Sequence, residues 1–345
     1  MPSLADSPIL RTEGLSRSFG KRLVLDHLNL SIRRGEIFGY IGPNGAGKTT
    51  TFRILCGLLE PSAGHAFVAD QMVTGNKDLI KQLVGYLPDN FGVYPAMNVQ
   101  EYLAFFCAAY KIPRRQRSAR IDACLEFAAA TDFRRESMSG LSRGIKQRIG
   151  IAKTLLHDPQ VLLLDEPLAT VDPHARVQIR QLLRHLADMG KAVLVSSHIL
   201  PELADVCDSV GILCGGKLLA SGPVAEILRT VNQKRLIEIH VLRFPTQTRQ
   251  VLAAAPGHWQ PLDNPQASAI PAPGMANTMR YEVQADEVQL AQALLLLLKR
   301  GIPVVGYAEI PADLEDVFMH FTRSPGDAGE VGSLQANENG NGEGH

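Results

Sequence analysis

The fold is decided by the stretch Gly42-Pro43-Asn44-Gly45-Ala46-Gly47-Lys48-Thr49. It matches the pattern Gly-x-x-x-x-Gly-Lys-Thr, follows an apolar strand at residues 37–41 and leads into an expected helix at 50–57. Glycines let successive backbone N–H groups turn toward one anion, and the start of the helix adds the positive end of its dipole. The pattern therefore predicts a phosphate loop. The alternative is a purely structural glycine-rich turn, but such a turn gives no packing reason for Lys-Thr at its end.

Each residue of this loop has an expected role. Lys48 would supply a mobile cation for the outer phosphates, and the Thr49 hydroxyl would bind Mg²⁺. The other groups expected to line the phosphates belong to the loop and the start of its helix. They are Gly42, Pro43, Asn44, Gly45, Ala46, Gly47 and Thr50.

An acidic pair lies downstream of the loop. The apolar run Val161–Leu164 predicts a buried strand that delivers Asp165 and Glu166 at its carboxyl end, where ligands bind in open α/β sheets. Asp165 is expected to hold Mg²⁺, and Glu166 to accept a proton from the attacking water as general base. The alternative is a pair of solvated carboxylates with no ligand.

The order of the chain indicates an α/β protein interrupted by helices. Apolar residues at helical spacing predict an all-helical segment at about 89–157, with helices at 99–110 and 121–130. A strand at 192–195 and a helix at 173–189 return to the α/β pattern. Residues 231–323 are expected to form a small α+β domain, with strands at 236–242, 281–283 and 304–305 and a helix at 288–299. The stretch 324–345 has six glycines, four acidic residues and no Lys or Arg, which predicts a disordered tail.

Composition excludes several classes of protein. The 345 residues carry 35 Lys+Arg and 35 Asp+Glu, so the whole chain is not a polyanion binder. Five cysteines without a Cys-x-x-Cys pattern favour a reducing, cytoplasmic location. We find no run of about 20 apolar residues that would span a bilayer, and no secretory signal.

Four motifs together resemble those of an ATP-binding cassette (ABC) ATPase. They are the loop at 42–49, Leu141-Ser142-Arg143-Gly144-Ile145-Lys146-Gln147-Arg148, the strand ending in Asp165-Glu166, and His198 after Val195-Ser196-Ser197. The resemblance covers about residues 8–230 and implies a phosphate-loop NTPase core with the helical segment as an inserted subdomain. Tyr86-Leu87-Pro88 and the stretch 313–318 look like ATPase subunits of bacterial exporters whose permease is a separate chain.

The resemblance also implies roles for single residues. Phe19 falls where the family stacks an aromatic ring on adenine, although a core phenylalanine is an equal alternative. His198 falls where the family contacts the γ-phosphate, and a structural histidine is the alternative. Ser142 and Gly144 would reach the ATP of an opposite subunit, which implies a head-to-tail dimer. Asp172 would belong to the loop between the two sites, or simply cap the helix that starts at Pro173.

Three positions depart from the family pattern. Asp89 replaces a glutamine that contacts Mg²⁺ and water, and its shorter carboxylate could still coordinate the metal. Arg143 replaces a glycine and Ile145 a glutamine in the segment 141–148, called the signature segment below. We expect these changes to affect the rate of hydrolysis more than ATP binding.

The function implied is that of the ATP-hydrolysing subunit of an ABC exporter, with ATP and Mg²⁺ as cofactors. Its expected partners are a membrane permease and a second copy of itself or a related ATPase, at the inner face of the cell membrane. The helical segment 89–157 has eleven Lys+Arg and six Asp+Glu, and this net charge of +5 could face the permease or lipid head groups or be simply solvated. Two alternatives remain: a soluble cassette ATPase acting on nucleic acid or ribosomes, and a low-turnover regulatory subunit. We expect no nucleic acid partner.

Overall fold

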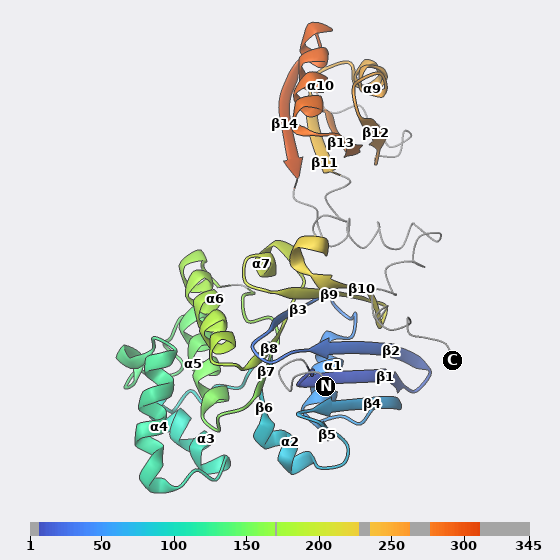
Figure 1. The fold of residues 1–345 in the computed structure, drawn as a ribbon. Coiled ribbons are helices and arrows are strands. Elements are labelled where there is room, and N and C mark those ends of the chain that lie inside the picture. Colours follow the sequence, from blue (N-terminus) through green and yellow to red (C-terminus); the bar gives the residue numbers. More distant parts are fainter. Residues whose placement is uncertain (1–6, 170, 228–234, 263–276, 311–345) are drawn as a thin grey trace, which may run out of the picture.

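The computed structural model describes residues 7–169, 171–227, 235–262 and 277–310, and their strands form three sheets (Figure 1). The largest sheet has the order β10-β9-β3-β8-β7-β6, and all its neighbouring strands are parallel except the β9–β10 pair. Every residue of β3, β7 and β8 is buried, as expected for parallel strands covered on both faces. The strand bounds are β3 (Ile37–Ile41), β6 (Val84–Leu87), β7 (Val161–Leu164), β8 (Ala192–Ser197), β9 (Ser209–Cys214) and β10 (Lys217–Pro223).

A second, antiparallel sheet packs with one face of the large sheet. Its order is β2-β1-β4-β5, and α1 contributes to the shared core through Phe52. The long hairpin of β1 and β2 was not predicted from the sequence. Register shifts interrupt this hairpin at three places, so its sequence lacks a regular apolar alternation. The bounds are β1 (Leu10–Phe19), β2 (Arg22–Ile32), α1 (Lys48–Leu55), β4 (Ala63–Val68), β5 (Gln71–Met72) and α2 (Lys77–Leu83).

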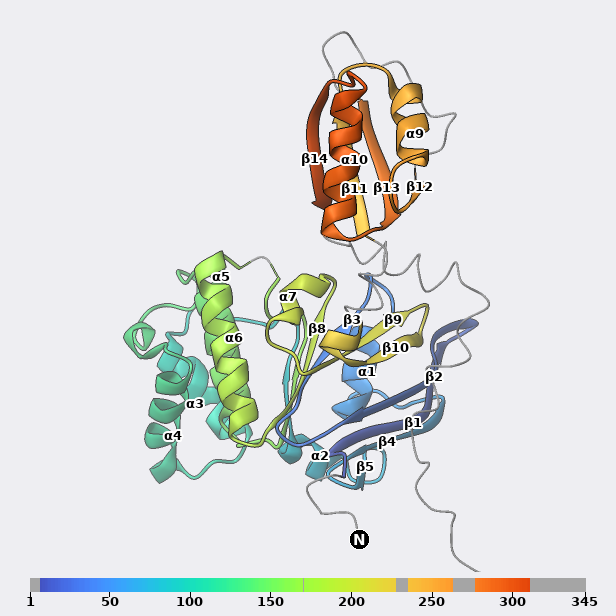
Figure 2. The same ribbon diagram turned by 45° about the horizontal axis from the view of Figure 1, so that its top comes forward.

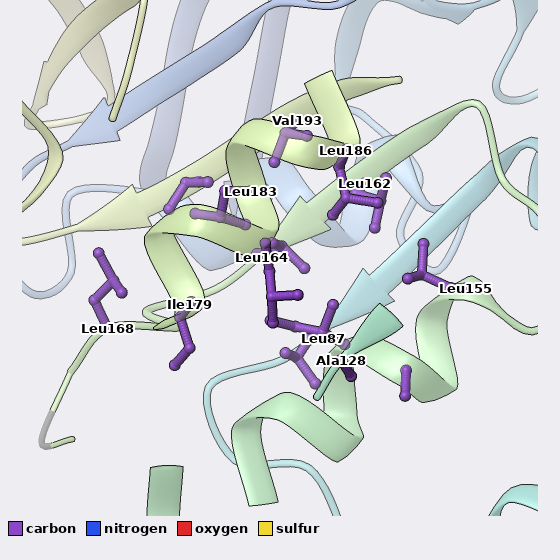
Figure 3. Packing of buried hydrophobic residues seen from close by; sticks show 14 of the residues in the cluster. Leu87, Ala128, Leu155, Leu162, Leu164, Leu168, Ile179, Leu183, Leu186 and Val193 are labelled. Carbon is purple, nitrogen blue, oxygen red and sulfur yellow. The ribbon is translucent and has the colours of Figure 1, made fainter. Parts of the chain in front are cut away.

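Helices cover the other face of the large sheet. In Figure 3, Leu162, Leu164 and Val193 of the strands lie among leucines and an isoleucine of the helices. The prediction of a helical segment at 89–157 is confirmed, although α4 begins at Arg114 instead of residue 121, because its first two turns are polar and carry no apolar spacing. The bounds are α3 (Val99–Ala109), α4 (Arg114–Phe127), the short 3₁₀ helix η1 (Thr131–Phe133), α5 (Arg143–Leu155), α6 (Pro173–Asp188) and α7 (Leu200–Ala204).

The C-terminal unit has its own antiparallel sheet, with the order β12-β13-β11-β14 and two helices on one face (Figure 2). Its β-α-β-β-α-β order is the ferredoxin-like arrangement. The predicted α+β character is confirmed, but α9 and β12 were missed. The predicted tail 324–345 lies outside the described residues. The bounds are β11 (Arg235–Val241), α9 (Pro245–Ala253), β12 (His258–Pro261), β13 (Asn277–Gln284), α10 (Glu287–Lys299) and β14 (Val304–Ile310).

Candidate active site

Four neighbouring parallel strands deliver the predicted site residues to one edge of the large sheet. The phosphate loop follows β3, His198 follows β8, Asp165 and Glu166 follow β7, and Asp89 lies just beyond β6. Residues more than 150 positions apart in the chain thus meet at the carboxyl ends of adjacent strands. This is the edge at which open α/β sheets bind ligands.

The loop between β3 and α1 has the backbone that an anion site requires. Gly45 and Gly47 have φ angles of 83° and 116°, a region that favours glycine. A Cβ on Gly42 would lie 2.3 Å from the carbonyl oxygen of Leu213. Gly47 caps α1 without a side-chain hydrogen bond, so the first N–H groups of the helix remain available to a ligand. The side chain of Ala46 belongs instead to the core.

Lys48 is held at the centre of the site. Only 7% of its side chain is exposed, and its Nζ donates a hydrogen bond to the carbonyl oxygen of Gly42. The same Nζ lies 3.3 Å from Oε1 of Glu166. A buried ammonium beside a carboxylate is electrostatically matched in the free protein, and an incoming phosphate could take over that role.

A chain of hydrogen bonds joins Thr49, Asp165 and Glu166. Thr49 Oγ1 donates to Asp165 Oδ2 over 2.8 Å, and Ser196 Oγ donates to Asp165 Oδ1 over 2.6 Å. Ser196 Oγ also accepts the backbone N–H of Glu166 at 2.9 Å. Burial raises the pKa of Asp165, and the two hydroxyls partly oppose that shift. Sequence reasoning missed Ser196; its signal is a serine at the end of an otherwise apolar, buried strand.

Glu166 is placed between the lysine and the histidine. Its backbone φ is 52°, a left-handed conformation that is strained for a non-glycine residue. Its Oε2 lies 3.0 Å from Nδ1 of His198, whose side chain is 45% exposed. The structure thus brings Glu166 and His198, which follow the adjacent strands β7 and β8, into direct contact.

Lys48, Thr49, Asp165 and Glu166 line a cleft of about 320 Å³, whose described lining does not include His198. Phe19 forms one wall with 47% of its surface exposed, and the Arg17 guanidinium lies over its ring at 4.6 Å. The alternative that Phe19 is a core residue is therefore wrong. The lining also includes Asp89 and most of the loop predicted to bind phosphates. The remaining lining residues are Arg22, Val24, Pro43, Asn44, Gly45, Gly47 and Thr50.

Comparison with known proteins shows which family has this arrangement. The model of the family described as ABC transporter matches residues 25–169. The chain is 32% identical over 321 residues to the Nod factor export ATP-binding protein I of Ralstonia nicotianae, covering 93% of this chain and 96% of that protein. It is 36% identical over 214 residues, 62% of this chain, to the probable multidrug ABC transporter ATP-binding protein YbhF of Escherichia coli, of which it spans 37%.

The chain belongs to the ABC transporter family. Within it, the chain is an ATP-binding subunit with the family's ATPase core. Among solved structures, cbiO1 of Clostridium perfringens, part of the ABC transporter complex cbiONQ, superposes with a TM-score of 0.60 at 26% identity, over 66% of this chain and 94% of that one. The predicted phosphate-loop NTPase fold is confirmed. Within the described ranges, no helix combines the length and apolar character needed to cross a membrane.

The signature segment of this ABC subunit lies elsewhere. Ser142 caps α5 by accepting the N–H of Ile145 at 3.4 Å, and Gly144 is buried in the first turn. A Cβ on Gly144 would lie 2.5 Å from Cβ of Ala175 in α6. Neither Ser142 nor Gly144 is among the described residues that line the cleft. The structure thus does not bring the signature segment to this chain's own phosphate loop.

Two departures from the ABC pattern contact each other. The side chains of Arg143 and Asp89 approach to 3.9 Å, and each is 55% exposed. Asp172 also has a defined local role: its Oδ1 accepts the Ala175 N–H at 2.9 Å, and this hydrogen bond lowers the pKa of Asp172. The helix-cap interpretation of Asp172 is therefore confirmed.

A magnesium ion would fit only together with a nucleotide. Thr49 Oγ1 and Asp165 Oδ2 are adjacent oxygens, and Asp89 lines the same cleft. The parts of the chain that the structure describes hold no group of three His, Cys, Asp or Glu residues able to bind a metal alone. Mg²⁺ commonly takes one or two carboxylates and completes its shell with phosphates and water, which suits this donor set.

Proposed function

We propose that this chain is the motor subunit of an exporter whose membrane permease is a separate chain. The observation that carries the proposal is the placement of the Glu166 carboxylate between Lys48 and His198, at the mouth of a phosphate loop. The Ralstonia relative, named as an export protein, matches along nearly its whole length. We place the chain at the cytoplasmic face of the membrane, with the cassette at 8–230, its helical subdomain at about 89–157, and an accessory domain at 231–323.

ATP would lie along the cleft. Phe19 would stack on the adenine, and the N–H groups of the loop and of the first turn of α1 would bind the phosphates. Lys48 would pair with the outer phosphates. Thr49, Asp165 and Asp89 would hold Mg²⁺, which when bound would neutralise charge on the phosphates.

Glu166 would act as the general base. Its carboxylate accepts a proton from a water whose oxygen forms a bond to the γ-phosphorus, while the bond from that phosphorus to the ADP oxygen breaks. His198 would hold the water and the γ-phosphate. Ser196 positions both carboxylates, because one hydroxyl contacts the side chain of Asp165 and the backbone of Glu166.

Two cassettes would close around two nucleotides. Ser142 and Gly144 lie away from their own cleft and begin a helix of thirteen residues, whose N-terminus can bind an anion. We propose that they contact the ATP of a second copy, or of a related ATPase, arranged head to tail. Because ATP would bind the closed dimer more tightly than the open one, it would drive closure, and closure would move the permease.

The helical subdomain is the proposed docking surface for the permease. Two of its eleven basic residues, Arg148 and Lys153, are buried, so the surface excess is smaller than the sequence count indicates. Tyr94 and Phe105 are each 45% exposed, with ring centres 5.5 Å apart. An exposed aromatic pair on a subdomain with an excess of basic residues suits a partner loop that is both apolar and acidic.

A mixing experiment tests the proposal. Two chains are prepared on a Glu166→Gln background, one with Lys48→Ala and the other with Ser142→Arg. Neither alone should form an ATP-dependent dimer, because each lacks one half of every composite site. A mixture of the two should form a heterodimer, because the intact loop of one chain meets the intact signature segment of the other. Sedimentation velocity with and without ATP measures dimer formation, and thermal unfolding checks that both chains fold.

Other outcomes would support a different function. Absence of the heterodimer, when the Glu166→Gln parent does dimerise, would overturn the head-to-tail arrangement. If the wild-type chain hydrolyses ATP only when nucleic acid or ribosomes are added, the result would favour the soluble ATPase. A wild-type chain that binds ATP without turnover, even beside its permease, would favour the regulatory subunit.

A further inference from the structure

Glu202 of α7 is a buried carboxylate to which the mechanism proposed above gives no role. Only 5% of the residue is exposed. Its Oε2 accepts a hydrogen bond from Oγ of Ser197 over 3.2 Å, and its Oε1 lies 3.2 Å from a terminal nitrogen of Arg176 in α6. Burial costs a carboxylate its hydration, and an apolar side chain of similar volume often packs at no loss of stability. Packing alone therefore does not account for Glu202.

The hydroxyl that Glu202 contacts lies immediately before His198 in the chain. Ser197 is 1% exposed, and its Oγ also accepts the backbone N–H of Ile199 over 3.0 Å. Because the hydroxyl donates to Glu202 and accepts from Ile199, both bonds together fix its orientation. A serine bonded in this way holds the backbone on both sides of His198. The carbonyl oxygen of Ser197 also accepts the N–H of Gly42 in the phosphate loop over 3.2 Å.

Helix α6 holds the segment that follows His198 through arginines on successive turns. The three arginines are spaced four residues apart, so they follow one side of the helix. They form the ion pairs Arg176–Glu202 at 3.2 Å, Arg180–Asp205 at 2.8 Å and Arg184–Asp208 at 2.9 Å. Of these three carboxylates only that of Glu202 is buried, since the side chains of Asp205 and Asp208 are 69% and 41% exposed. The buried pair is also the one that contacts the turn of His198.

We propose that Glu202 is a positioning residue for His198. Its carboxylate, held by Arg176, fixes the Ser197 hydroxyl, and this hydroxyl fixes the turn that presents the imidazole to Glu166. Nδ1 of His198 lies 3.0 Å from Oε2 of Glu166, a distance that a displaced turn would not keep. The imidazole itself is 45% exposed, so its own packing holds it only in part. The inference rests on the proposed function, in which His198 holds the attacking water and the γ-phosphate.

Loss of the Glu202 carboxylate should affect turnover more than nucleotide affinity. Phe19 and Lys48, which would bind the adenine and the outer phosphates, belong to β1 and α1 and keep their own supports. A displaced imidazole would instead misplace the attacking water. Small errors in the placement of reacting groups lower reaction rates strongly, even when the cause lies outside the site. The catalytic rate constant kcat should therefore report the role of Glu202.

Kinetics of the full chain test this role. Glu202→Ala should lower kcat for ATP hydrolysis about tenfold or more, while the affinity for a non-hydrolysable ATP analogue stays within about twofold of the wild type. Ser197→Ala should act similarly, and the double variant should be no slower than the slower single variant, because both changes break one link. Asp205→Asn removes the next ion pair of α6 and is the matched control, which should keep the wild-type kcat. Thermal unfolding checks that each variant is folded at the assay temperature.

A second comparison separates positioning from a general loss of structure. In a His198→Ala background, Glu202→Ala should lower the rate less than about twofold, because no imidazole remains to be placed. Single-turnover hydrolysis of radiolabelled ATP at high protein concentration measures these slow rates. Glu202→Gln keeps an acceptor oxygen and the side-chain volume, so it should retain more of the wild-type rate than Glu202→Ala does.

Three results would overturn the positioning role. An equal loss of rate in the wild-type and His198→Ala backgrounds would show that Glu202 only stabilises the fold. A loss of ATP affinity as large as the loss of kcat would place its effect on the phosphate loop. An unchanged kcat in Glu202→Ala would show that the turn holds without it. The mixing experiment above keeps Glu202 in both chains, so failure of the proposed head-to-tail dimer is a separate result.

Discussion

Helices α1 and α5 both begin at a glycine-bearing segment, and both bury a lysine, Lys48 and Lys153, that is 7% exposed. The surroundings of the two ammonium groups differ. Lys48 lies against a backbone carbonyl and the Glu166 carboxylate. Nζ of Lys153 lies 5.1 Å and 5.5 Å from the ring centres of Phe106 and Phe91, and burial lowers its pKa to about 8. Lys48 is therefore paired with a carboxylate, whereas burial disfavours the charged form of Lys153.

The starts of the two helices also differ in how their N–H groups are satisfied. Gly47 leaves the N-terminus of α1 without a side-chain cap, whereas the hydroxyl of Ser142 accepts an N–H of α5. The start of α1 also has a lysine and two carboxylates around it. We infer that α1 provides a binding site with its own catalytic groups, and that α5 provides only donors to a site completed by another chain.

The largest effect should follow from removing the carboxylate beside Lys48. We expect Glu166→Gln to lower the rate of ATP hydrolysis by about 10²–10⁴-fold, the usual contribution of a general base, while ATP binding persists. Steady-state phosphate release and nucleotide binding measure the two. Glu60→Gln, an exposed carboxylate paired with Lys77, is the control and should change neither. Unchanged turnover in Glu166→Gln would place the base elsewhere.

The second effect concerns Lys153, the buried lysine of α5. Lys153→Met should raise the free energy of unfolding at pH 7 by up to about 3 kcal/mol, because the folded protein no longer buries an ammonium. The folded pKa lies below the ordinary value of 10.5, so the native state releases its proton first as the pH rises. Stability of the wild type should therefore increase between about pH 8 and 10.5, and Lys153→Met should remove this increase.

Urea unfolding across that pH range measures the Lys153 effect. Lys146→Met, on the same helix but part-exposed, should leave the pH dependence unchanged. A wild-type stability that falls from pH 8 to 10 in parallel with Lys153→Met would contradict the assignment of this titration to Lys153.

The third effect tests whether Gly144 of α5 is required for close packing against α6. Alanine normally favours a helix over glycine by up to about 1 kcal/mol. Gly144→Ala should nevertheless destabilise the protein by about 1–3 kcal/mol, because its Cβ would meet Cβ of Ala175. Ala175→Gly in the same chain should restore part of the loss, as urea unfolding would show. If the double variant stays as unstable as Gly144→Ala, the contact with α6 is not the cause.

The sequence predicted what is local and missed what depends on distant pairing. The phosphate loop and the Asp165-Glu166 pair each sit in a few consecutive residues after an apolar strand, so both were found. The β1–β2 hairpin was missed because its bulges break the alternation. Ser196 escaped because a hydroxyl shows no role until the fold sets it beside Asp165. Strand β12 was missed because it spans four residues, of which only Trp259 is buried.

The smallest effect concerns an ion pair that links the start of α5 to the cleft beside α1. Asp89 and Arg143, 54 positions apart in the sequence, each depart from the family pattern and lie 3.9 Å apart. Because both are 55% exposed, a double-mutant cycle of Asp89→Asn and Arg143→Ala should give a coupling below about 1 kcal/mol. The coupling should shrink further in high salt. A coupling above 2 kcal/mol would mean that the two helix starts are energetically joined within one chain, and that the signature segment is held toward its own cleft when nucleotide is absent.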